Sequence, residues 1–243
     1  MPATDLPPLT LIHGIGGRPD HAGPLLAALG ADRDRVTAPA LPGHAATSSS
    51  SPPSRALPDD VPTAAAWLAR RVPTSGGLLI GHSTGGVLAL AMAASGAVAP
   101  SGVVVIDSNV PVAPAAVAAK AAKAELARRA DWREALRASL ARDWAGPDPW
   151  CERVFADLAA TPDEPKRALW ESVLRADSRS LWAAQCAPVL YLRSTRALAQ
   201  AEVRDVVGPG VRVDVVEVGR GHWPHLDAPE AVAAAIRAWW ESV

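Results

Sequence analysis

Residues 78–86 are Leu-Leu-Ile-Gly-His-Ser-Thr-Gly-Gly, and this stretch decides which fold the chain is expected to adopt. The first three residues are apolar, as in a buried strand, and residues 87–94 continue as an apolar helix. Between them Ser83 has a glycine two positions before it and another two positions after it, the spacing G-x-S-x-G. A serine at a sharp turn from strand to helix has a strained backbone, and side chains at positions 81 and 85 would collide there. A glycine-rich loop could follow a strand by chance, but this context favours Ser83 as a nucleophile at the start of a helix.

Short apolar runs alternate with helical segments along the rest of the chain. Strands are expected at residues 9–12, 36–41, 78–80, 103–106, 189–192 and 211–218, and helices at 21–30, 62–72, 87–94, 198–207 and 228–242. The strands are continuous runs of Val, Ile and Leu, which is typical of a parallel sheet covered on both faces. We therefore predict an α/β fold with a doubly wound, mostly parallel sheet of about six strands.

Between the fourth and fifth expected strands, residues 112–185 have helical periodicity and no strand of comparable strength. Prolines predict breaks that leave about four short helices; they are Pro147, Pro149, Pro162 and Pro165. We expect an all-helical cap at residues 111–186, inserted after the strand that ends at Asp107. Residues 1–110 and 187–243 are then expected to form the core.

Tryptophan supplies nearly all of the large aromatic surface, with nine Trp against one Tyr and one Phe. Five of the nine lie between residues 110 and 187. Because tryptophan is bulky and carries an N–H that needs a partner, such a cluster suits the wall of a cavity. Ordinary helix packing explains any single one of them equally well. The residues expected to contact a substrate are Trp182, Trp132, Trp144 and Trp223.

A glycine-rich segment, His13-Gly14-Ile15-Gly16-Gly17, follows the first strand. Acyl transfer needs hydrogen-bond donors aimed at the oxygen that becomes negative, each worth about 3–4 kcal/mol. One donor is expected to be the backbone N–H of Thr84, the residue after the nucleophile. The other is expected to be the N–H of Ile15. Alone this segment would be a plain turn, but together with Ser83 it predicts an oxyanion hole.

A serine hydroxyl needs a neighbouring imidazole to take its proton. Of the six histidines, the best candidate for this base is His222, on the loop between the last strand and the last helix. His225 is its rival, although its place at a helix start favours capping or packing. The other histidines are expected to be structural at turns or, for His21, exposed; the structural ones are His13, His44 and His82.

The third group must accept the other ring N–H of the histidine. Asp107 directly ends the strand that follows the nucleophile helix. The strand after the insertion ends without a carboxylate, and only Glu202 and Asp205 lie further on. We therefore predict Asp107 as the acid, with capping of a loop as its alternative role and Glu202 and Asp205 as alternative acids.

The formal net charge of -1 and the absence of long like-charge runs give no support for binding to nucleic acid or to an anionic membrane. Apolar stretches are interrupted before they could span a bilayer, and no signal peptide is visible after Met1. We expect a cytoplasmic protein that acts on a small molecule and requires no metal or cofactor. The sequence makes no prediction of oligomeric state.

Four segments together resemble the α/β-hydrolase superfamily: His13-Gly14, Leu41-Pro42-Gly43-His44, Gly81 to Gly86, and Gly221-His222-Trp223-Pro224-His225-Leu226. The resemblance covers nearly the whole chain outside residues 110–187. It implies Ser83 as nucleophile, His222 as base and the insertion as a cap over the active site.

Two departures from the family pattern are visible. The usual N-terminal strand pair is missing, and so is the usual acid after the cap. The position of Asp107 is instead similar to that in some haloalkane dehalogenases and in zearalenone-type lactone hydrolases. Dehalogenases and epoxide hydrolases use an aspartate nucleophile, so Ser83 argues against both chemistries.

The expected activity is hydrolysis of a carboxylic ester or lactone of a small to medium apolar substrate, through an acyl-enzyme on Ser83. The same three residues could serve a C–C bond hydrolase, a thioesterase or an enzyme like hydroxynitrile lyase. A barely catalytic small-molecule receptor is a further alternative, which turnover would distinguish from an enzyme.

Overall fold

The computed structural model describes residues 6–44, 57–108, 113–144, 148–194 and 203–243. Within these residues, six strands form one parallel sheet in the order β2-β1-β3-β4-β5-β6. The strands are β1 (Leu9–Ile12), β2 (Val36–Thr37), β3 (Leu78–His82), β4 (Gly102–Ile106), β5 (Val189–Arg193) and β6 (Val213–Glu217). The predicted six-stranded α/β fold is confirmed. β2 is shorter than expected, because Pro39 has no N–H to donate to a neighbouring strand.

The register of the central strands fixes where the loops emerge. His82 pairs with Ile106 across β3 and β4, and Ile12 pairs with Gly81 across β1 and β3. Ser83 and Asp107 therefore leave the sheet side by side, next to the loop that begins at His13. In parallel α/β sheets this carboxyl edge is where ligands bind.

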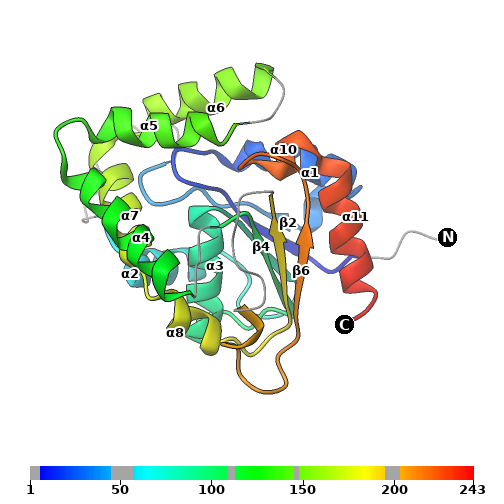
Figure 1. Cartoon of the computed structure of the whole chain (residues 1–243). Coiled ribbons are helices and arrows are strands. Elements are labelled where there is room, and N and C mark those ends of the chain that lie inside the picture. The colour runs from blue at the N-terminus through cyan, green and yellow to red at the C-terminus, as the bar shows by residue number, and fades with distance from the viewer. Residues whose placement is uncertain (1–5, 45–56, 109–112, 145–147, 195–202) are drawn as a thin grey trace.

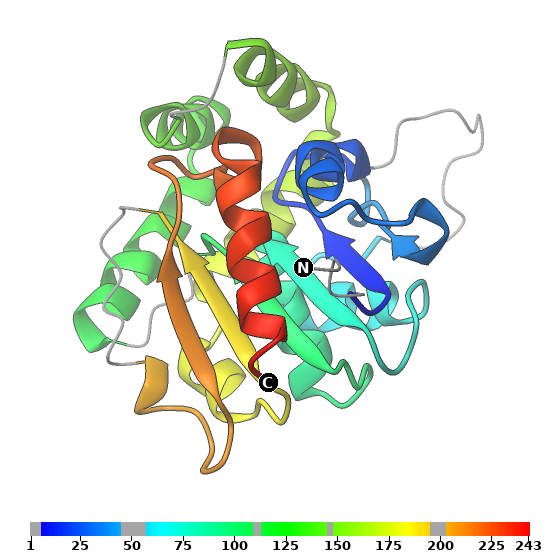
Figure 2. The same cartoon turned by 90° about the vertical axis from the view of Figure 1, so that its right-hand side faces the viewer.

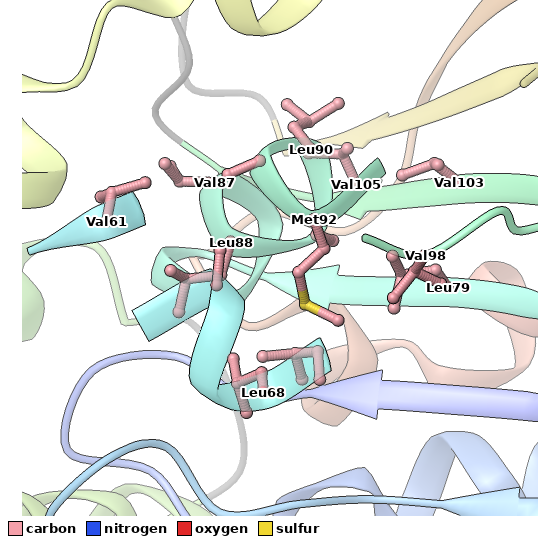
Figure 3. Packing of buried hydrophobic residues seen from close by; sticks show 14 of the residues in the cluster. Val61, Leu68, Leu79, Val87, Leu88, Leu90, Met92, Val98, Val103 and Val105 are labelled. Carbon is pink, nitrogen blue, oxygen red and sulfur yellow. The ribbon is translucent and has the colours of Figure 1, made fainter. Parts of the chain in front are cut away.

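One face of the sheet is covered by α2 (Val61–Ala69), α3 (Thr84–Ala94) and α8 (Ser178–Ala183). Figure 3 shows the apolar layer between α3 and the strands, where Leu88, Met92 and Val105 pack with their neighbours. α3 is apolar on almost all sides, because α2, β3 and β4 surround it. This packing fixes the position of α3, which begins directly after Ser83.

The other face is covered by α1 (Gly23–Ala28) and α11 (Pro229–Trp240), and Figure 2 shows α11 lying across the strands. α11 buries Val232, Ile236 and Trp239, whose spacing places them on one side of a helix. It corresponds to the helix expected at residues 228–242. Of the helix expected at 198–207, residues 198–202 lie outside the described residues.

Between β4 and β5 the described chain is helical, as predicted. It contains α4 (Pro114–Ala124), the 3-10 helix η3 (Glu125–Arg128), α5 (Trp132–Arg142), α6 (Asp148–Ala160), α7 (Asp163–Arg175) and α8. In Figure 1, α5 and α6 lie above the ends at which the strands finish. We call α4 to α8 the helical insertion. No described helix has the length and apolar character needed to cross a bilayer.

Two of the prolines do not break helices as expected. Pro149 and Pro165 lie in the first turns of α6 and α7. The N–H groups of a first turn have no partner within the helix, so proline costs little there. Pro162 does precede α7, whereas Pro147 lies outside the described residues.

Side-chain hydrogen bonds connect α6 and the residue after it to the loop that follows β1. His21 Nε2 lies 2.8 Å from Asp157 Oδ2, and Arg18 Nη1 donates to Thr161 Oγ1 at 3.2 Å. A side chain at Gly16 would come within 3.0 Å of the Cα of Leu158, so the two backbones are in close contact. The expectation that His21 is exposed is wrong: only 3% of its surface is accessible, because α6 covers it.

Candidate active site

Ser83 stands at the turn between β3 and α3 with backbone angles φ 52° and ψ −118°. This strained conformation needs space on both sides of the serine. A Cβ at Gly81 would lie 2.2 Å from the carbonyl oxygen of Gly85, and a Cβ at Gly85 would lie 2.1 Å from that of Ile12. Only glycine fits at these two positions, which is why the G-x-S-x-G spacing accompanies the turn.

Three side chains from distant parts of the chain meet at this turn. His222 Nε2 lies 2.9 Å from Ser83 Oγ, and His222 Nδ1 lies 2.7 Å from Asp107 Oδ2. With the proton on Nδ1, the ring donates to the carboxylate and Nε2 is left to accept the hydroxyl proton of Ser83. The structure thus brings together the three residues that the sequence singled out as nucleophile, base and acid.

Asp107 is held rigidly behind the imidazole. It is 0% exposed, and its Oδ1 accepts a hydrogen bond from the backbone N–H of Ser194 at 2.8 Å. Its own N–H donates to the carbonyl oxygen of Leu192 at 2.7 Å. Of the alternative acids, Asp205 is exposed at the surface, and Glu202 lies outside the described residues.

The backbone of His222 is fixed from two sides. Its N–H donates to the carbonyl oxygen of Asp143 in the helical insertion at 2.7 Å. Its carbonyl oxygen lies 2.7 Å from Nε2 of His82, the residue before the nucleophile. His82 is therefore structural, as expected, but its partner could not be inferred from the sequence.

Two supporting residues were missed by the sequence analysis. Ser108 Oγ donates to the carbonyl oxygen of Ser83 at 2.7 Å, and Tyr191 OH donates to the carbonyl oxygen of Ser108 at 2.7 Å. Both are buried. In the sequence, only the position of Ser108 next to Asp107 hinted at a role in the site, because no local sequence pattern links Ser108 to Ser83.

The two residues expected to form the oxyanion hole, Ile15 and Thr84, line the same cavity as Ser83. Thr84 is the first residue of α3, where N–H groups have no partner within the helix. Gly14 lets the Ile15 loop approach, since a Cβ there would lie 3.1 Å from Ser83 Cβ. The N-terminal end of α3 also favours negative charge at this place.

The cavity beside Ser83 and His222 has a volume of about 290 Å³. Much of its wall comes from α4, η3, α5 and α7 of the helical insertion. The larger apolar residues of the walls are Leu126, Leu136, Leu140, Trp170, Val173 and Leu174, and the polar ones are Lys123, Ser139, Arg142 and Asp143.

None of the four tryptophans expected to contact a substrate is among the described residues that line this cavity. Trp182 is 0% exposed and packs against Tyr191 in the core, with ring centroids 5.8 Å apart. Trp144 and Trp223 pack against each other at 4.7 Å, and Trp132 is buried within the helical insertion. Packing in the hydrophobic core accounts for all four, of which Trp132 and Trp182 lie in helices and Trp144 and Trp223 lie outside them.

Trp170 is the tryptophan that does line the cavity. It lies on α7 three and four residues before Val173 and Leu174, which line the cavity as well. Residues with this spacing share one face of a helix. The same spacing joins Trp132 to Ala135 and Leu136, which line the cavity although Trp132 does not, so the sequence pattern alone could not single out Trp170.

A group of buried histidines lies behind the site. Burial lowers the pKa of His13 to about 3, and its Nε2 accepts the backbone N–H of Leu41 at 3.0 Å. Burial, together with nearby His21 and His222, also lowers the pKa of His225 to about 3. The His225 ring packs on His82 at 4.3 Å, and its Nδ1 is buried with no described partner. These histidines are neutral in the folded protein at neutral pH.

The His225→Leu variant is expected to lose less stability in acid than the wild type. Above about pH 6.5 the histidine is neutral in both the folded and the unfolded chain, and it makes no difference. Below that pH the unfolded chain binds a proton that the folded chain refuses until about pH 3, so stability falls across this window. Between pH 7.5 and pH 4.5 the wild type should lose about 3 kcal/mol more than the variant, which is two pH units at about 1.36 kcal/mol each.

Urea unfolding at the two pH values measures this difference. Leu226→Val is the matched control, because it trims a buried side chain on the same short helix without removing a titrating group. It should keep the full pH dependence of the wild type. An equal acid sensitivity in His225→Leu and wild type would show that His225 takes up its proton in the folded state.

Among the described residues, no group of three His, Cys, Asp or Glu side chains is arranged to hold a metal ion.

Comparison with solved structures gives the same fold for other hydrolases. A hydrolase from Pseudomonas aeruginosa PA01 matches with a TM-score of 0.72 at 20% identity, over 98% of this chain and 91% of that one. A thermophilic esterase from Thermogutta terrifontis matches with a TM-score of 0.66 at 24% identity, over 99% and 91%. A hydrolase from Oleispira antarctica matches with a TM-score of 0.70 at 14% identity, over 97% and 91%.

No curated protein sequence matches the chain. The sequence profile described as the alpha/beta hydrolase family matches residues 11–235, which include the end of β1, the Ser83 turn and His222. The chain therefore belongs to the alpha/beta hydrolase family.

Proposed function

We propose that this protein hydrolyses a carboxylic ester or lactone through an acyl-enzyme formed on Ser83. The observation that carries the proposal is the continuous hydrogen-bonded line from Ser83 Oγ through His222 to Asp107, at the wall of a cavity of about 290 Å³. A hydroxyl activated in this way attacks carbonyl carbon.

In the first half of the proposed reaction, His222 Nε2 takes the proton of Ser83 as Oγ bonds to the carbonyl carbon. The carbonyl oxygen becomes an oxyanion and accepts hydrogen bonds from the N–H groups of Ile15 and Thr84. The carbon–oxygen bond to the leaving alcohol then breaks, and His222 returns the proton to the departing oxygen. Asp107 remains ionised and stabilises the imidazolium throughout.

In the second half, water takes the place of the alcohol. His222 removes a proton from the water as its oxygen attacks the acyl carbon, and the oxyanion forms again in the same place. Collapse of this intermediate breaks the bond to Ser83 Oγ and returns the proton to it. The products are a carboxylic acid and the free serine.

The walls of the cavity support a small to medium acyl or alcohol group. They are mostly apolar, with Leu136, Leu140 and Trp170 among them, and the volume of about 290 Å³ lies at the lower end of ligand pockets. An aliphatic chain would bury its surface there without leaving polar groups unpaired. The esterase among the similar structures is consistent with this chemistry.

Trapping the intermediate tests the proposal. The wild type is mixed with para-nitrophenyl esters of increasing acyl length, quenched in acid within the first turnover, and digested for mass spectrometry. The peptide that contains Ser83 should carry the acyl group, and a burst of para-nitrophenol should equal the enzyme concentration when deacylation is slow. Turnover with the acyl group on another residue would contradict the mechanism, and no turnover of any ester or lactone would favour a receptor.

A further inference from the structure

The cavity next to Ser83 is not uniformly apolar, because two cations lie in its lining. Lys123 comes from the last turn of α4 and Arg142 from the last turn of α5. Both side chains are exposed, and among the lining residues that the structure describes Asp143 is the single carboxylate. The described lining therefore carries two positive charges against one negative charge.

These two cations differ from most others of the helical insertion. Six of the others are paired with carboxylates: Arg128, Arg129, Arg133, Arg153, Lys166 and Arg175. Among the described residues, neither Lys123 nor Arg142 has such a partner within ion-pairing distance. Their charges are available to a ligand in the cavity.

Arg142 is also held close to the reacting groups by the backbone. The next residue, Asp143, accepts the N–H of His222 at 2.7 Å through its carbonyl oxygen. Leu136 and Leu140, on the same helix as Arg142, contribute apolar wall. A ligand with its carbonyl at Ser83 would therefore meet apolar side chains and then a positive charge.

We infer that the preferred substrates are esters with an aliphatic chain that ends in a carboxylate, held by Lys123 and Arg142. This inference rests on the proposed function, since it places the ester carbonyl at Ser83. The apolar walls accommodate the methylene groups, and the two cations pair with the carboxylate at the mouth of the cavity. A neutral ester of the same length gains the apolar contacts alone.

The test compares two substrates of equal acyl length, mono-para-nitrophenyl adipate and para-nitrophenyl hexanoate. The measured quantity is the ratio of their kcat/KM values, anionic over neutral. Lys123→Gln combined with Arg142→Gln should lower this ratio about tenfold, since each exposed ion pair contributes up to about fivefold. Raising the salt concentration should lower the ratio in the wild type and leave it unchanged in the double variant.

Arg167→Gln is the matched control. Arg167 is exposed on α7, has no described carboxylate partner and does not line the cavity. Its loss should leave the ratio unchanged, whereas Arg142→Lys should retain most of the preference because the charge remains. The inference would be overturned if the ratio of kcat/KM values were the same in the wild type and the double variant. It would also be overturned if Arg167→Gln lowered this ratio as much as the double variant does.

A binding measurement separates this inference from the proposed function. Hexanoate and hexanamide are titrated calorimetrically into the wild type and the double variant. Tighter binding of hexanoate that disappears in the double variant would support the anion site even if no ester were turned over. Ester turnover with no preference for the anion in either measurement would leave the proposed function standing and overturn the anion site.

Discussion

The Ser83→Ala variant is expected to lose about a million-fold in kcat for any ester that the wild type hydrolyses, as in other enzymes with a serine nucleophile. The hydroxyl that lies 2.9 Å from His222 Nε2 supplies the electron pair for the acyl-enzyme, and alanine offers none. The residual rate would come from water that enters the vacated position, with the oxyanion donors still in place. Stopped-flow and long-time assays with para-nitrophenyl butyrate cover this range.

Ser139→Ala is the control for this variant. Ser139 lines the same cavity from α5, so its loss changes a hydroxyl in the wall without touching the turn after β3. Its kcat should stay within a fewfold of wild type, and both variants should unfold at the wild-type urea concentration. Turnover in Ser83→Ala at the wild-type rate would remove Ser83 as nucleophile and with it the proposed mechanism.

The features that the sequence predicted well are local ones. The turn at Ser83 needs glycine at positions 81 and 85 because backbone oxygens occupy the space of their side chains, and five adjacent residues carry this requirement. The order of strands and helices follows from apolar runs of four or five residues. His222 could be placed because the family keeps its base on the loop after the last strand.

The predictions that were wrong concern features that depend on how the helices are rotated and packed. The tryptophan positions required knowing which face of each helix turns toward the cavity, and composition alone does not contain this information. The exposure of His21 depends on α6, whose Asp157 lies 136 residues further along the chain. The bonds from Ser108 to Ser83 and from His82 to His222 likewise join segments that no local pattern connects.

Asp107→Asn is expected to lower kcat roughly 10,000-fold with little change in KM, because it changes which ring nitrogen of His222 carries the proton. The geometry decides which end of the new amide faces the ring. The backbone N–H of Ser194 donates to Oδ1 at 2.8 Å, so the amide oxygen should stay at that position. The amide NH₂ then occupies the position of Oδ2, 2.7 Å from His222 Nδ1.

A donor at that position requires Nδ1 to be the acceptor, which moves the ring proton to Nε2. Nε2 then donates toward Ser83 Oγ and can no longer take its proton, although every heavy atom stays in place. The nitrogen-15 shifts of the His222 ring should report this change of tautomer. The double variant Glu202→Gln and Asp205→Asn provides the comparison. If Asp107→Asn kept full activity while the double variant lost it, the acid would be Glu202 or Asp205 and not Asp107. The expected result is the opposite, because the exposed Asp205 lies outside the hydrogen-bonded line from Ser83 to Asp107.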